Sequence, residues 1–156
     1  MNMHVRDTGM RIVPLDRKTL ALALLFERDQ AMANNSNLLV ANLNNAWACW
    51  RGEKLIGAGG LAPIWFGRAE AWMLVSGHAR RREIVAGVRL ARVWLDRKAL
   101  LPEFNRIEIW VRADAPWRMS FTRALGFHEF PALARAHGMD GADFFMHARV
   151  ANRSGV

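Results

Sequence analysis

Apolar residues recur at helical spacing, every three to four positions, in three stretches of the chain. The first stretch is 17–32, and the second, 80–101, is the longest regular pattern and ends before a proline. A shorter pattern at 115–125 stops before a glycine, which is typical of a helix C-cap. These stretches predict three helices, and one helical turn in the Asn-rich segment 34–45 would make a fourth.

Between the helices, apolar and polar residues alternate with the period of two that marks a strand with one buried face. The strands expected from this pattern are 10–15, 47–50, 54–61, 69–75, 106–112, 128–133 and 144–150. Arg51-Gly52-Glu53 joins the second and third of them as a hairpin. Because the long helix links 69–75 to 106–112, the crossover rule makes these two strands parallel. The order therefore predicts a mixed α/β sheet.

One domain accounts for most of the chain. The 156 residues are 52% hydrophobic and 23% charged, which is typical of a globular domain. We expect it to span 10–150, with an N-terminal tail at 1–9 and a C-terminal tail at 151–156. The longest apolar run has seven residues, whereas a membrane-spanning helix needs about 20. Charged residues at 27–29 interrupt the signal-peptide-like segment, so the expected location is cytoplasmic.

Two residue types are scarce enough to exclude some chemistry. The chain has no tyrosine, so none of its mechanisms uses a phenol as general acid or nucleophile. Cys49 is the single cysteine, which rules out an intramolecular disulfide or a cysteine-based zinc cluster. Since Cys49 stands in an apolar strand, we interpret it as a small buried hydrophobe.

The chain is strongly basic, with 22 Lys+Arg against 14 Asp+Glu and a formal net charge of +8. Nearly all of the basic residues are arginines, a composition typical of GC-rich genomes, so the total charge alone is a weak argument for nucleic-acid binding. Arg80, Arg81 and Arg82 are different, because they concentrate charge at the start of the long predicted helix. We therefore base the argument for anion binding on this cluster.

The segment Trp117–Phe127 ends in Leu125-Gly126-Phe127 and resembles the short fourth helix and Leu-Gly-Phe turn of the GNAT superfamily of acyl-CoA-dependent N-acetyltransferases. The likeness in element order covers about 10–150. Within the superfamily, 72–82 and 109–111 look most like small acetyltransferase-like proteins of short-tailed phages. The resemblance implies a single-domain mixed sheet of six to seven strands with splayed central parallel strands, three to four helices, and acetyl-CoA as co-substrate.

Where parallel strands splay apart, the backbone of one strand can pair with the extended pantetheine arm of CoA. The resemblance places this edge at 69–76, with Leu74, Val75 and Ser76 in contact with the cofactor. A backbone N–H near Leu74 or Val75 would be the oxyanion donor. Trp117 is a further candidate contact for the cofactor.

The start of the long helix is the expected pyrophosphate site, because free backbone N–H groups and the helix dipole favour an anion there. Arg80, Arg81 and Arg82 add charge at this point. The alternative is that the three arginines form an ordinary solvated face. The chain also departs from the family's loop, since Glu83 and Val85 stand where glycines permit close approach to phosphate. A carboxylate at Glu83 would repel the pyrophosphate unless it were paired to an arginine.

Acetyl transfer needs a base for the amine and a proton for the departing thiolate. The resemblance implies that Glu70 is the base, and the period of two puts its carboxylate on the same face as Trp72. The alternatives are that Glu70 is an ordinary glutamate at a strand end, or that Glu108 or Asp114 is the base. Thr122 occupies the position of the family's tyrosine, so Thr122, the nearby Ser120 or a water would supply the proton. The family's asparagine corresponds to Ala115.

Three functions are compatible with these features. The first is an N-acetyltransferase that moves an acetyl group from acetyl-CoA to an amine of a small molecule or protein, with an oligomer compatible with this function. The second is a non-catalytic phage virion or host-interaction protein on the same scaffold, suggested by the missing glycines and tyrosine. The third, nucleic-acid binding, rests on charge alone and is disfavoured.

Overall fold

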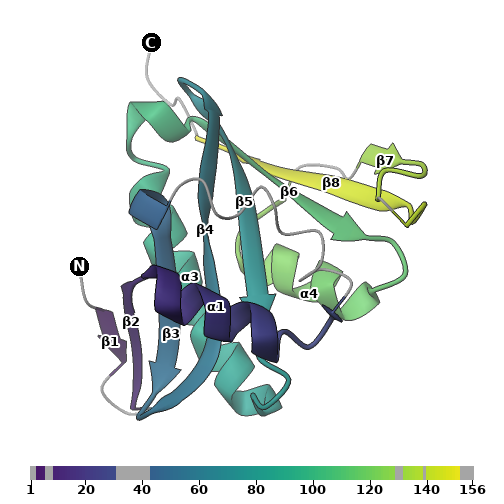
Figure 1. The fold of residues 1–156 in the computed structure, drawn as a ribbon. Coiled ribbons are helices and arrows are strands. Elements are labelled where there is room, and N and C mark those ends of the chain that lie inside the picture. Colours follow the sequence, from purple (N-terminus) through teal and green to yellow (C-terminus); the bar gives the residue numbers. More distant parts are fainter. Residues whose placement is uncertain (1–2, 6–8, 31–42, 129–131, 139, 152–156) are drawn as a thin grey trace. The chain divides into compact units, whose positions relative to one another are not determined.

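The computed structural model describes residues 3–5, 9–30, 43–128, 132–138 and 140–151 (Figure 1). The strands are β1 (Met3–Val5), β2 (Met10–Pro14), β3 (Ala46–Arg51), β4 (Lys54–Trp65), β5 (Arg68–Val75), β6 (Arg106–Arg112), β7 (Ala132–Ala134) and β8 (Phe144–Val150). The α-helices are α1 (Arg17–Phe26), α3 (Arg81–Lys98) and α4 (Pro116–Ala124), and 3-10 turns lie at Leu43–Asn45 and Pro102–Phe104. The predicted Asn-rich loop and the first part of the predicted strand 128–133 fall mostly outside the described residues.

The strands form a mixed sheet in the order β1-β2-β3-β4-β5-β6-β8-β7. β1, β2, β3 and β4 are successively antiparallel, β5 and β6 are parallel, and β8 is antiparallel to both β6 and β7. The parallel pair confirms the crossover prediction, and the mixed α/β fold class is confirmed with it. Over the residues that the structure describes, the sheet has eight strands rather than six or seven, because β1 (Met3–Val5) adds a strand that is too short to show a period in the sequence.

Contacts group the chain into two compact units. Unit 1 comprises Met1–Ala62 and Trp72–Ala91, and unit 2 comprises Pro63–Ala71 and Arg92–Val156. The expected domain boundaries at 10 and 150 stay a prediction. No helix of the described residues is both long and apolar enough to span a bilayer.

In unit 1, α1 packs on one face of the sheet. Leu20 and Ala23 of α1 join a buried cluster with Ala48, Ala58 and Leu74 from three strands. The helix begins after Asp16, whose Oδ1 accepts the Thr19 N–H at 2.7 Å, a bond that lowers the pKa of this carboxyl. α1 ends at Phe26, earlier than the predicted 32, because the backbone at Glu27 leaves helical geometry.

The opposite face of this part of the sheet lies against the first turns of α3. A Cβ at Gly87 of α3 would lie 3.5 Å from the Cys49 Sγ and 3.8 Å from Ile56 and Met10, so a small residue lets the helix pack closely. Cys49 is fully buried, and burial raises the pKa of its thiol to about 12. The interpretation of Cys49 as a small hydrophobe is confirmed.

In unit 2, β6 pairs with β8 along its whole length and with β5 over Arg68–Ala71. The residues at 107, 109 and 111 of β6 are buried, so its other face carries the alternate residues 106, 108, 110 and 112. α4 ends before Gly126, whose φ of 92° only glycine adopts readily, as the C-cap prediction required.

Candidate functional site

The end of β5 lies at the edge of unit 1 and carries the residues expected to contact the cofactor. A Cβ at Gly57 of β4 would lie 2.5 Å from the carbonyl oxygen of Leu74, and the N–H of Ser76 donates to the carbonyl of Ile56 at 3.0 Å. Leu74 and Ser76 therefore direct their backbone groups toward β4. Because backbone groups alternate along a strand, Val75 directs its N–H and C=O away from β4.

Both of these Val75 groups are bonded to the chain segment that follows α1. The Val75 N–H donates to Oε2 of Glu27 at 2.6 Å, and the Val75 carbonyl accepts from the Arg28 N–H at 2.8 Å. Glu27 and Ser76 form an antiparallel bridge, and the Gly77 N–H donates to the Phe26 carbonyl at 2.8 Å. We name residues 26–30 the strap. The strap and a pantetheine arm cannot both occupy the Val75 edge.

The α3 start carries the predicted arginine cluster. Arg80, Arg81 and Arg82 are exposed and line an open depression of about 650 Å³ together with Arg89 and Val85. Within the described part of the chain, nothing accepts a hydrogen bond from the backbone N–H of Arg81 or Arg82. Free first-turn N–H groups surrounded by guanidinium groups are the arrangement that binds a phosphate or another anion.

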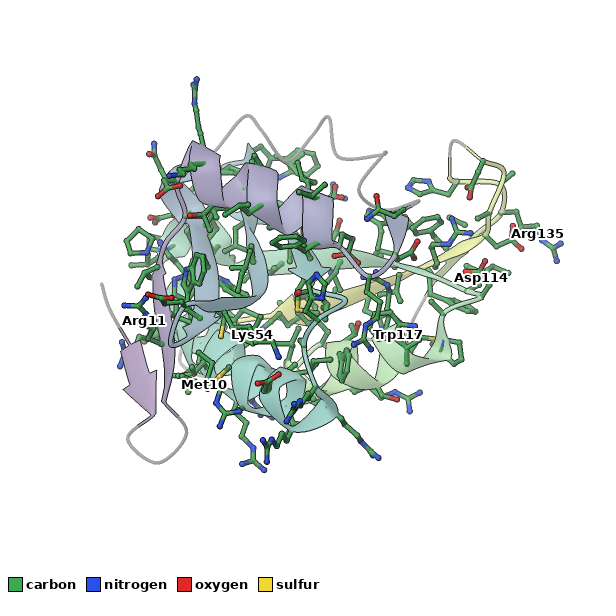
Figure 2. All side chains as sticks on the ribbon, turned by 60° about the horizontal axis from the view of Figure 1, so that its bottom comes forward. Met10, Arg11, Lys54, Asp114, Trp117 and Arg135 are labelled. Atoms are coloured by element: carbon green, nitrogen blue, oxygen red, sulfur yellow. The ribbon has the colours of Figure 1, made fainter. Side chains whose placement is uncertain are left out.

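Glu83 is turned away from this depression into the body of unit 1. Its side chain is 5% exposed and accepts bonds from Lys54 at 2.8 Å, from the Arg80 N–H at 2.7 Å and from Arg51 at 3.0 Å. Figure 2 shows Lys54, where β4 begins. Burial raises the pKa of Glu83, but the three hydrogen bonds outweigh it and lower the pKa to about 2. The carboxylate is thus charged and neutralised by two cations, as the paired alternative of the sequence analysis required.

Unit 2 carries Glu70, the predicted base, on β5 beside Glu108 of β6. Glu108 is buried and accepts from Arg68 and from Arg106, both at 2.6 Å. Glu70 is half-buried and has no hydrogen bond or ion pair among the described residues. Burial raises the pKa of Glu70, the potential of His137 opposes the rise, and the Glu108 carboxylate adds to it.

An aromatic stack lies on the same strand face as Glu70. Trp110 of β6 stacks on His137 with ring centroids 4.2 Å apart, and Phe144 meets the edge of His137 at 5.6 Å. Trp110 shares this face with Glu108 because the two are separated by one residue. Sequence analysis did not assign a role to either ring. The available sequence signal for Trp110 was its position on the same strand face as the charged residues 106, 108 and 112.

The α4 candidates differ in how free their side chains are. Thr122 is buried, and its Oγ1 donates to the Arg118 carbonyl at 2.9 Å, which commits its single hydroxyl proton. Ser120 is exposed. Trp117, labelled in Figure 2, meets the edge of Phe121 at 5.5 Å, and the Arg118 guanidinium lies 4.5 Å from its ring centroid. Of the two hydroxyls, the exposed one is that of Ser120.

The predicted residues therefore fall into two groups. Unit 1 brings together the end of β5 and the start of α3: Leu74, Val75, Ser76, Arg80, Arg81 and Arg82. Unit 2 contains Glu70, Trp117, Ser120 and Thr122. Among the described residues, no group of three or more His, Cys, Asp or Glu side chains could hold a metal ion.

The fold now has a class: a mixed sheet with this strand order and this helix crossover is the GNAT N-acetyltransferase fold. The spermidine N-acetyltransferase SpeG from Vibrio cholerae, solved in complex with CoA and spermine, has a TM-score of 0.70 at 13% identity, with 94% of this chain and 98% of that chain covered. A GNAT-family acetyltransferase from Bacillus anthracis has a TM-score of 0.69 at 10% identity, with 93% and 96% covered. No family model and no curated protein matches the sequence. At such identities the likeness shows the fold.

Proposed function

We propose that the protein is an acyl-CoA-dependent N-acetyltransferase that moves an acetyl group from acetyl-CoA to an amine. The observation that carries the proposal is the α3 start, where the unpartnered N–H groups of Arg81 and Arg82 lie among exposed arginines. This arrangement suits a pyrophosphate. The fold supports the proposal, since a structure with this fold was solved with CoA and spermine bound.

In this proposal, unit 1 holds the CoA. Arg80, Arg81 and Arg82 bind its pyrophosphate, and the end of β5, at Leu74, Val75 and Ser76, pairs with its pantetheine arm. Glu83, which stands in place of a glycine, does not repel the pyrophosphate in this proposal, because its carboxylate is bonded to Arg51 and Lys54.

Glu70 and Ser120 are the acid–base groups of this proposal. Glu70 takes a proton from the acceptor's ammonium group, and its raised pKa brings its basicity closer to that of the amine. The free amine then attacks the thioester carbonyl, so that a C–N bond forms and the C–S bond breaks. As the amide forms, its nitrogen gives up a proton that reaches the leaving thiolate through Ser120 or a water, which is left unchanged, because the chain has no tyrosine. Trp117 is a further contact for the CoA.

The acceptor in this proposal carries a single ammonium group at the reacting end. Arg68 and Arg106 already form ion pairs with the Glu108 carboxylate and compensate its charge, so in this proposal Glu108 does not bind a second ammonium group. Glu70 is the carboxylate left for the amine, and the Trp110–His137 stack beside it offers an aromatic surface.

Calorimetry with acetyl-CoA tests the proposal. We expect micromolar to millimolar binding that weakens by about tenfold in the double variant R81Q/R82Q, because two charge-assisted contacts are lost. The matched control is R17Q/K18Q, which removes the same charge from exposed positions at the start of α1. Absence of binding to the unaltered protein at millimolar acetyl-CoA would refute the proposal.

A second candidate, a non-catalytic phage virion or host-interaction protein, is favoured by one observation. The strap already occupies the Val75 backbone. This candidate predicts that the protein is recovered with a virion or host protein and that it binds no acetyl-CoA. Phage origin is a proposal that rests on the sequence resemblance. A cytoplasmic location, or the host cytoplasm or a virion if the protein is phage-encoded, is likewise a proposal, and so is an oligomeric state.

A further inference from the structure

Glu27 is the strap residue whose position conflicts with acyl-CoA binding. Its side chain lies 48 residues away from Val75 in the sequence, yet its Oε2 is 2.6 Å from the Val75 nitrogen. The residue is only 3% exposed. A buried carboxylate costs free energy unless it is well bonded, so this contact is a built feature of the fold rather than a surface accident.

Two contacts within the strap fix its conformation, and a third attaches it to the loop before α3. The second oxygen of Glu27, Oε1, accepts the Asp29 N–H at 3.0 Å, and the Glu27 carbonyl accepts from Gln30 at 2.8 Å. The Arg28 guanidinium donates to the Ala79 carbonyl at 2.9 Å, which ties the strap to the loop before α3. Glu27 therefore reaches Val75 from a segment that is bonded internally and is attached to the loop before α3 through Arg28.

A carboxylate oxygen and a ligand carbonyl oxygen are both acceptors, and a backbone N–H donates one proton. If the Val75 N–H is to bond a carbonyl of acyl-CoA, the Glu27 carboxylate has to leave it first. A charge-assisted bond is about twice as strong as a neutral one, so the carboxylate is a strong competitor.

We propose that Glu27 competes within the chain for the Val75 N–H, so that a carbonyl of an acyl-CoA ligand binds there only by displacing the strap. This inference rests on the proposed function. It makes Glu27 a residue that sets the affinity for acyl-CoA and couples binding to release of the strap.

Two variants separate the charge of Glu27 from its shape. E27A removes the competing acceptor, so acetyl-CoA should bind about tenfold more tightly. E27Q keeps an acceptor oxygen of similar shape without the charge, so we expect a gain of about threefold. E53A, which alters an exposed glutamate in the turn between β3 and β4, should leave the affinity unchanged. Thermal melting of each variant identifies any that do not fold, and E27Q is the conservative variant if E27A does not.

Free CoA serves as the second ligand because it has the pantetheine carbonyls but no acyl carbonyl. A gain for acetyl-CoA alone identifies the thioester carbonyl as the competitor of Glu27. An equal gain for both ligands identifies a pantetheine carbonyl. If neither affinity rises in a folded Glu27 variant that binds both ligands, the inference is overturned while the proposed function stands. If neither ligand binds to any variant, the proposed function has failed and the inference fails with it.

The backbone amide of Val75 gives a readout that does not depend on affinity. In the unaltered protein we expect its hydrogen exchange to be slow, because the N–H is bonded to a buried carboxylate. Exchange at Val75 should accelerate in E27A by more than at Leu74, whose backbone faces β4. Equal acceleration at both residues would indicate general loosening of β5 and would count against a specific contact.

Discussion

Glu83 in unit 1 and Glu70 in unit 2 are both withdrawn from solvent, yet their environments act on them in opposite directions. Glu83 accepts bonds from two cations and a backbone N–H, and its pKa is lowered to about 2. Glu70 has no bonded partner among the described residues, and its pKa is raised. The comparison shows that bonded partners, more than burial, decide whether the pKa of a carboxylate here is lowered or raised.

The neighbour of Glu70 explains why it is unpaired. Glu108, opposite it in the strand register, takes the bonds of both nearby arginines, Arg68 and Arg106. Burial raises the pKa of Glu108, but these two hydrogen bonds outweigh it and the pKa is lowered. The charge of Glu108 is thus compensated by two arginines, whereas Glu70, on the same strand face, has no bonded partner among the described residues.

The largest effect is expected from removing the carboxylate of Glu83, the glutamate with bonded partners. E83A leaves Arg51 and Lys54 without their shared carboxylate and the Arg80 N–H without its acceptor. The two cations are 41% and 36% exposed and can be solvated, so we expect a loss of about 2–3 kcal/mol in the free energy of unfolding. Urea denaturation measures it. E53Q in the nearby turn should stay within about 0.5 kcal/mol of the unaltered protein, and an equally small loss for E83A would show that pairing contributes little.

Altering the unpaired side should affect catalysis instead. E70Q removes the proposed base without removing a hydrogen bond, so kcat/KM should fall by about a hundredfold while the protein loses no stability. Initial rates with acetyl-CoA and a primary amine, together with a urea titration, check both parts. A fall in rate of less than about threefold would assign Glu70 to the surface-glutamate alternative.

The pH dependence of stability should have opposite signs for the two residues. The pKa of Glu83 is lowered from 4.5 in the folded state, so its stabilisation is present above pH 4.5 and is lost as pH falls toward about 2. The pKa of Glu70 is raised, so its contribution is most favourable at low pH and is lost as pH rises past its folded-state pKa. Thermal melts from pH 7 to pH 3 should show E83Q less stable and E70Q more stable than the unaltered protein at pH 7. Both gaps should narrow on acidification, and a gap of the same sign for both variants at pH 7 would contradict the comparison.

Local features of the sequence predicted most of the fold. The period-two alternation over 106–112 and the long helix before it were enough to predict the parallel pairing of β5 with β6. Gly126 predicted the end of α4, because a helix C-cap often needs a positive φ and glycine is the residue that adopts it readily. The end of α1 at Phe26 was not predictable in this way, since neither a glycine nor a proline follows it. The helix stops there because the next residues bond to Val75 and Gly77, about 50 positions away.

The candidate site residues also divide into those that a local sequence pattern predicts and those whose contacts come from distant parts of the chain. Arg80, Arg81 and Arg82 were recognisable because they are consecutive and stand at a helix start. The partners of Glu83 come from the β3–β4 hairpin, about 30 residues earlier, and the Glu27–Val75 contact spans 48 residues. No local pattern encodes such pairs. The Trp110–His137 stack was missed for the same reason, because β8 and the turn before it have to fold back along β6 before the rings meet.

The smallest effect is expected from removing His137, which acts on the pKa of Glu70, the glutamate without a bonded partner among the described residues. His137 is exposed, and its potential lowers the pKa of Glu70 against the effect of burial. H137A should therefore move the acidic limb of the kcat/KM profile to higher pH, because Glu70 stays protonated over a wider range. Stability should change by no more than about 0.5 kcal/mol, since the side chain lies at the surface. H128A, which removes another exposed histidine of unit 2, is the matched control and should leave the profile in place. If the limb moves in neither variant while E70Q abolishes it, Glu70 is the base but His137 does not tune it, and the stack with Trp110 then serves packing alone.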